Sequence, residues 1–197
     1  MAERPLVGIS SCLLGENVRY DGGHKLDRYL RDTLGKHVDF VPVCPEVECG
    51  MGVPREAVRL VSSGGGIRLV TRETNIDMTD RMRSWMAGRL EELAALPLSG
   101  FIFKSRSPSA GLMRVKVYTD RGVRNDGTGI FAKGVIERLP FLPVEDDARL
   151  GDEKLRENFI ERIFVMHRWH IVLTGDRSLG ALLQFHSDHK YLLMAHC

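Results

Sequence analysis

Short apolar runs alternate with longer amphipathic stretches over the first three quarters of the chain. Five runs have the length and the β-branched or aromatic content of strands. They cover residues 6–9, 38–43, 101–103, 115–118 and 141–144. Two further runs, 58–61 and 67–70, flank a segment rich in Ser and Gly and predict a β-hairpin.

Helical spacing of apolar residues predicts three helices between these strands, at 24–34, 77–96 and 129–139. The longest of them carries its apolar face on Met78, Met82, Trp85, Met86, Leu90 and Leu93. This order predicts an α/β fold, a mostly parallel sheet flanked by helices in three Rossmann-like layers, with one appended hairpin.

The pattern changes after a polar, acidic joint at 146–152. One helical face then carries Leu155, Phe159, Ile163, Met166 and His170, and a second helix is predicted at 179–196 after a turn. We therefore expect a helical hairpin that packs on the first domain or on another chain. The chain divides into an α/β domain at 1–147 and a helical segment at 152–197, which we expect to be the start of a truncated second domain.

The composition is that of an ordinary globular protein. The 197 residues are 43% hydrophobic and 27% charged, which excludes a disordered tail or a disulfide-rich miniprotein. The 28 basic and 26 acidic residues leave a net charge of only +2, so no nucleic-acid partner is expected. No segment has the features of a secretory signal or a membrane span, which predicts a cytoplasmic protein without membrane contact.

Polar clusters follow four of the predicted strands, at residues 10–15, 44–50, 104–111 and 145–147. In open parallel sheets, ligands bind at the carboxyl ends of the strands. These segments are therefore expected to converge on one crevice.

Cysteines stand out in two of the clusters. The chain has Cys12, Cys44, Cys49 and Cys197, and a reducing compartment keeps such thiols unpaired. Cys12 and Cys44 each come directly after a strand, where thiolates suit zinc or an iron–sulfur cluster. Neither spacing is Cys-x-x-Cys, so the residues alone favour two semi-buried thiols.

The other residues of the clusters also permit two interpretations. Glu46 and Glu48 face the same way in an extended loop, where one can handle protons or both are solvated. The hydroxyl-rich segment 105–111 can cradle an anion, bind a heterocycle or simply form a tight turn.

One pattern of histidines and one of glycines give weaker evidence for a functional site. The pairs His167/His170 and His186/His189 could bind a metal, but no carboxylate supports them and packing within the helices is favoured. The glycines at 64–66 lack the lysine and spacing of a phosphate-binding P-loop.

Four motifs together resemble the thiouracil desulfurase (desulfidase) family, long known as a domain of unknown function. They are VGISSCLLGENVRYDGGHK, VPVCPEVECGMGVPRE, FKSRSPSAG and GTGIF, and they span most of residues 1–145. The helical segment resembles the start of an uncharacterised domain that follows the first in YbgA-like proteins.

The resemblance implies an enzyme with a [4Fe–4S] cluster held by three cysteines, whose open iron takes the sulfur of a thiocarbonyl. Its substrate would be a thiolated nucleobase or a related heterocycle, and sulfide would leave without net redox change. Cys12 and Cys44 match two of the cluster ligands. Glu46 matches an acid near the substrate, and Ser107 and Ser109 match a loop that contacts substrate or cluster.

One position departs from the family pattern. Ala110 stands where the third cysteine is expected, and a methyl group cannot bind iron. Cys49 in the neighbouring loop is the candidate substitute. The alternatives are a ligand-binding or regulatory protein that has lost the cluster, and a zinc protein that uses Cys12, Cys44 and Cys49. A second copy of the chain is a further candidate partner.

Overall fold

The computed structural model describes residues 4–64 and 66–195 and contains two four-stranded sheets. The first sheet is fully parallel. Its strand order is β2 (Asp39–Val43), β1 (Leu6–Ser10), β5 (Leu98–Phe103) and β8 (Val144–Asp146). Side chains of β5 alternate between the two faces: Phe101 and Phe103 point to one face and Ile102 to the other. Gly8 of β1 has no room for a Cβ, which would lie 2.2 Å from the ring of Phe101.

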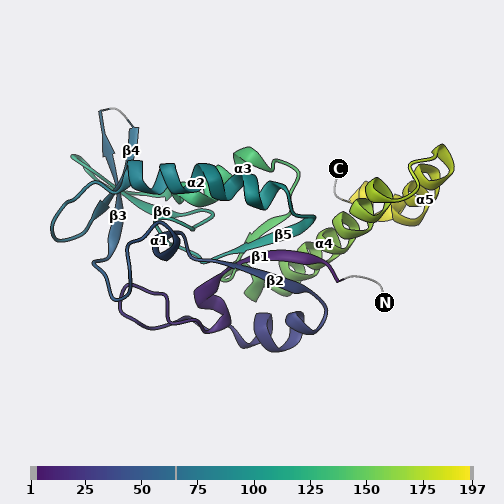
Figure 1. Ribbon diagram of the computed structural model, residues 1–197, viewed down its shortest axis with the longest axis horizontal. Helices are drawn as coiled ribbons and strands as arrows, with labels where there is room; N and C mark the ends of the chain where they lie inside the picture. Colours follow the sequence, from purple (N-terminus) through teal and green to yellow (C-terminus); the bar gives the residue numbers. More distant parts are fainter. Residues whose placement is uncertain (1–3, 65, 196–197) are drawn as a thin grey trace.

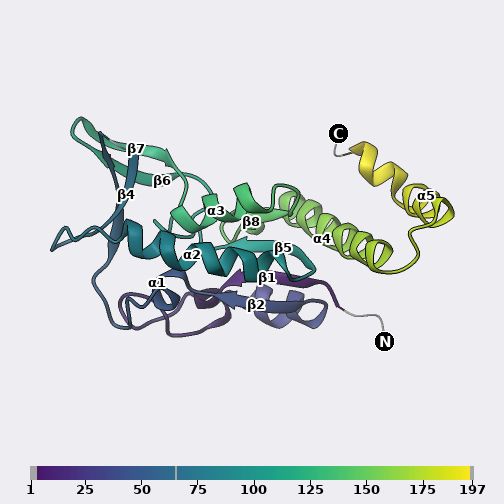
Figure 2. The same ribbon diagram turned by 45° about the horizontal axis from the view of Figure 1, so that its top comes forward.

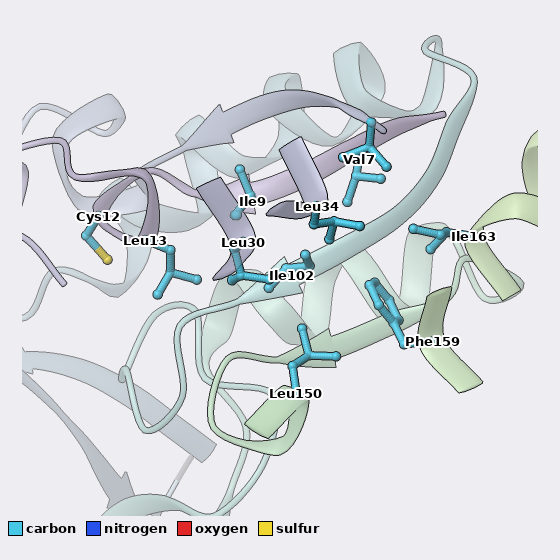
Figure 3. Packing of buried hydrophobic residues seen from close by; sticks show 11 residues of the cluster. Val7, Ile9, Cys12, Leu13, Leu30, Leu34, Ile102, Leu150, Phe159 and Ile163 are labelled. Atoms are coloured by element: carbon cyan, nitrogen blue, oxygen red, sulfur yellow. The ribbon is translucent and has the colours of Figure 1, made fainter. Parts of the chain in front are cut away.

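Helices cover both faces of the parallel sheet, which confirms the predicted three-layer α/β fold. On one face, α2 (Thr79–Ala94) and α3 (Ile130–Arg138) pack over Phe101 and Phe103. On the other face, short helical turns and α4 (Glu153–Thr174) enclose the cluster shown in Figure 3. Its buried members include Val7, Ile9, Leu13, Leu30, Ile102, Phe159 and Ile163.

The second sheet is larger than the predicted hairpin. Its strand order is β4 (Gly66–Thr71), β3 (Val58–Ser63), β6 (Val115–Thr119) and β7 (Gly122–Gly127). Strand β7 was not predicted, because its residues are mostly polar and exposed and show no apolar alternation. The sheet lies at one end of the molecule, and α5 (Leu179–Ala195) lies at the opposite end (Figures 1 and 2).

Three local predictions on the first domain are wrong. The strand expected at 141–144 is β8, Val144–Asp146, and Phe141 is exposed. The helix expected at 24–34 is reduced to a π-helical turn, Tyr29–Thr33, followed by a 3-10 turn, Leu34–Lys36. The N–H groups of Lys25 and Asp27 instead donate to the carbonyls of Cys12 and Leu13, so this segment lies along the loop after β1. The segment after β2, expected to be a loop, contains a short helix, α1 (Pro45–Glu48), which begins with proline as helices often do.

The two C-terminal helices form the expected pair, and the first of them packs on the sheet. Phe159 and Ile163 of α4 are 2% and 0% exposed, and both would contact a Cβ at Gly100 of β5. Helix α5 contacts α4 through Phe185, whose ring centroid lies 5.2 Å from that of Trp169. Within the described residues, no helix has the length and apolar character to cross a membrane. The division at 147 and 152 stays a prediction, and Cys197 lies outside the described residues.

Candidate active site

A cavity of about 290 Å³ lies at the carboxyl edge of the parallel sheet. The strands end there in register, since Ser10 pairs with Val43 and Ile9 with Ile102. The segments that follow β1, β2 and β5 therefore meet, as the sequence predicted. Of the residues singled out in the sequence, Cys12, Cys44, Glu46, Ser107 and Ala110 line this cavity.

Two buried thiols face this cavity. Cys12 lies in the 3-10 turn Ser11–Leu14 after β1, and Cys44 is the residue before α1. The Sγ atom of Cys44 lies 3.7 Å from the carbonyl oxygen of Val18 and 3.6 Å from Oε2 of Glu46. Burial raises the pKa of Cys12 to about 11 and the pKa of Cys44 to about 12, and the nearby Glu46 carboxylate adds to both shifts. Both side chains are therefore neutral thiols near pH 7.

Glu46 is the carboxylate of the cavity and is oriented by the loop after β5. The Oγ atom of Ser109 donates a 2.5 Å hydrogen bond to its Oε1, and Ser109 in turn shares a 3.0 Å hydrogen bond with Ser107. The N–H of Ala110 donates to Oγ of Ser107 at 3.2 Å. Nη2 of Arg55 lies 4.0 Å from Oε2 of Glu46. The loop after β5 and helix α1 thus form one polar network around the carboxylate of Glu46.

Asp147 fixes the base of the loop after β5. Its Oδ1 accepts the N–H of Ser105 at 2.7 Å, and its Oδ2 pairs with Nζ of Lys104 at 2.7 Å. The N–H of Lys104 donates to Oγ of Ser10 at 2.9 Å, which joins the loop to the end of β1. From the fourth polar cluster, Asp147 therefore supports the site, whereas Glu145 is buried and pairs with Arg149.

Cys49 does not face this cavity. It is 7% exposed and belongs to a separate apolar cluster with Leu60 and Met82. Its thiol donates to the carbonyl oxygen of Glu46 at 3.3 Å, and its own carbonyl accepts from Nε of Arg81 at 2.7 Å. Cys49 therefore does not line the cavity that holds Cys12 and Cys44, and its place in their ligand set stays a prediction.

No three-residue metal site was found in the described part of the chain. Over residues 4–64 and 66–195, no group of three or more His, Cys, Asp or Glu side chains is arranged to hold a metal ion. The zinc alternative therefore has no support from the geometry. Among the histidines, His189 is buried, with Nε2 3.0 Å from Nη1 of Arg168 and Nδ1 2.8 Å from the carbonyl oxygen of Phe185. These contacts account for its burial by packing.

A basic groove of about 460 Å³ lies beside the cavity, on the second sheet. Arg72, Arg106 and Pro108 are among the residues that line both hollows, so the two are adjacent. The cations of the groove are Arg59, Arg72, Arg106, Arg114 and Lys116, and no Asp or Glu lines it. The net charge of +2 gave no sign of this groove, because its cations come from separate segments that only the fold brings together.

Comparison with known proteins identifies the family. The family model described as 2-thiouracil desulfurase matches residues 7–147. The chain belongs to this family. It is also 27% identical to the uncharacterized protein YbbK of Bacillus subtilis (strain 168) over 132 residues, which are 64% of this chain and 87% of YbbK. A solved structure titled as the [4Fe-4S]-dependent thiouracil desulfidase TudS is similar, with a TM-score of 0.57, 28% identity and coverage of 76% and 93% of the two chains.

The residues of this family member do not fit a cluster held by three thiolates. Cys12 and Cys44 offer two thiols to the cavity, and Ala110 stands at the third position. Cys49 lies in another core cluster. The donor set at the cavity is therefore one thiolate short of the set that the family resemblance implies.

Proposed function

We propose that this chain binds a thiolated pyrimidine nucleotide, with the base in the cavity and the phosphate in the basic groove. The observation that carries the proposal is the adjacency of the two hollows, which share Arg72 and Arg106 in their linings. The cavity is partly apolar, which suits a heterocycle, and the guanidinium groups of Arg72 and Arg106 can bind phosphate by paired charge-assisted hydrogen bonds.

The cavity offers hydrogen-bonding groups suited to a pyrimidine ring. The carboxylate of Glu46 can accept a ring N–H, and its orientation by Ser109 favours a defined geometry. The hydroxyl of Ser107 can donate to a ring carbonyl or thiocarbonyl. Cys12 and Cys44 present polarizable sulfur atoms to the same space, which suits the sulfur of the base.

The family reaction on such a ligand is the exchange of C=S for C=O. One water is consumed and one hydrogen sulfide is released, so carbon is neither oxidised nor reduced overall. In this chain Glu46 is the group placed to hold or transfer a proton, because it is the acid that lines the cavity.

Binding of 2-thiouracil, 2-thiouridine monophosphate and uridine monophosphate by isothermal titration calorimetry tests the proposal. The thiolated nucleotide should bind at least about tenfold more tightly than the free base, since each charged hydrogen bond contributes about 1.5–3 kcal/mol. Arg106→Gln should remove most of this advantage. Arg121→Gln, on the distant β6–β7 turn, is the matched control and should leave it unchanged. Equal affinity for base and nucleotide would overturn the phosphate assignment.

A further inference from the structure

We infer that this chain binds thiolated pyrimidines without removing their sulfur, because its cavity has lost one of the three thiolates needed for the cluster. The ligand named here rests on the proposed function, whereas the statement about the cluster rests on the donor set alone. The inference follows from Ala110, from the position of Cys49 and from the number of thiols that remain at the cavity.

The loop around Ala110 is closely packed. Ala110 lines the same cavity as Cys12 and Cys44 and is only 4% exposed. Its N–H is bound to Ser107, and the N–H of Gly111 donates to the carbonyl of Ser107 at 2.7 Å. A Cβ at Gly111 would lie 2.6 Å from that same carbonyl, so the chain here is closely packed. Ala110 thus lies in a closely packed loop at the cavity but offers no side-chain atom that can bind iron.

No other described thiol can replace the missing one without rearrangement. Cys49 is held by its own hydrogen bond to the carbonyl of Glu46 and by the contact of Arg81 to its carbonyl. A second contact from Arg81 reaches the carbonyl of Gly50 at 2.7 Å. Turning the Cys49 side chain into the cavity would break the hydrogen bond of its thiol to Glu46 and remove the sulfur from its apolar cluster. Cys197 lies outside the described residues, and the variant Cys197→Ser tests whether it binds iron.

The two remaining thiols are too few to hold a cluster firmly. With three thiolates, one iron of a cubic cluster is left for substrate. With Cys12 and Cys44 alone, two irons lack a protein ligand, so the cluster is held by fewer bonds and is lost more readily.

Anaerobic iron and sulfide reconstitution of the full chain tests this inference. The wild type should retain less than half of one [4Fe–4S] cluster per chain after desalting, and Ala110→Cys should approach full occupancy with a visible thiolate-to-iron absorption band. Ala110→Ser is the matched control, since its hydroxyl fills similar space without a thiolate, and it should remain low. Cys49→Ser and Cys197→Ser should leave the wild-type value unchanged.

Three results would overturn the inference. Full occupancy in the wild type would show that two thiols suffice or that another ligand acts, and a loss in Cys49→Ser or Cys197→Ser would identify it. Equal, low occupancy in wild type and Ala110→Cys, with both proteins folded by circular dichroism, would show that the missing thiolate is not the cause. If the reconstituted wild type releases sulfide from 2-thiouracil at the same rate as Ala110→Cys, the missing thiolate does not prevent the reaction.

Ligand binding separates this result from the proposed function. Calorimetry on the metal-free wild type measures thiolated nucleotide binding without any cluster. Failure to bind would contradict the proposed function and leave the iron result standing. Binding together with full cluster occupancy would contradict the inference and leave the proposed function standing.

Discussion

Ser109 donates a 2.5 Å hydrogen bond to Glu46, across 63 positions of the sequence. This contact joins the loop after β5 to the helix after β2 and places a carboxylate between the hydroxyls and the thiol of Cys44. The same carboxylate raises the pKa of that thiol. Glu46 therefore affects both ligand recognition and thiol ionisation, and each effect can be measured.

Glu46→Gln should weaken thiolated nucleotide binding and make Cys44 more acidic. Loss of a charged hydrogen-bond acceptor costs about 1.5–3 kcal/mol, so the dissociation constant should rise about tenfold or more. The pKa of Cys44 should fall, because a negative charge that opposes thiolate formation has been removed. The rate of alkylation of Cys44 against pH, followed by mass spectrometry, measures the shift. An unchanged profile would show that the two groups are not coupled.

Most of the site could be predicted from the order of the elements. The runs at 6–9, 38–43 and 101–103 are apolar enough to be buried strands, and parallel strands bring their carboxyl ends together. Cys12, Cys44 and Ser107 therefore converge without any knowledge of side-chain geometry. The direction in which the Cys49 side chain points could not be predicted. It depends on one helical turn, α1, in a segment that the sequence predicted as a loop.

The basic groove could be predicted only in part. Arg106 and Lys116 lie in residues 93–119, a stretch with four basic and no acidic residues, but Arg59 comes from a separate segment. Arg59 and Lys116 meet because β3 pairs in parallel with β6, a long-range pairing that the sequence pattern did not indicate. Strand β7 was missed as well, so the second sheet was expected to be a hairpin alone.

The raised thiol pKa values predict a loss of stability in alkaline solution. The folded-state pKa values of about 11 and 12 lie above the ordinary value of 9.0, so the folded state holds these protons more tightly than the unfolded state. Their stabilising contribution is complete below about pH 9 and is lost as the pH rises through 11–12. Urea unfolding between pH 8 and 10.5 should show a steeper decline for the wild type than for Cys12→Ala/Cys44→Ala. Parallel curves of unfolding free energy against pH for the two proteins would contradict this prediction.

Glu48 should stabilise the segment that carries Cys44. Its Oε1 accepts the N–H of Cys44 at 2.9 Å, and its Oε2 lies 3.1 Å from Nε of Arg89 in α2. Glu48→Ala removes both interactions and should lower the free energy of unfolding by about 1–3 kcal/mol. Glu48→Gln keeps an acceptor for the N–H and should cost less. Urea unfolding compares the two variants, and equal losses would mean that the ion pair with Arg89 is the more important contact.

Phe159 should be required for the stability of the α/β domain, although it lies beyond the predicted domain boundary. Its side chain is 2% exposed and packs with Ile163 above Gly100 of β5, as part of the same core cluster as the strands. Phe159→Ala should lower the free energy of unfolding by about 3–5 kcal/mol. Leu183→Ala, in α5 and 60% exposed, is the matched control and should cost less than about 0.5 kcal/mol. Near-ultraviolet circular dichroism during urea unfolding follows the tertiary packing of both variants. If Phe159→Ala costs no more than Leu183→Ala, α4 contributes little to the core of the sheet, and a boundary near residue 152 describes the folding unit better.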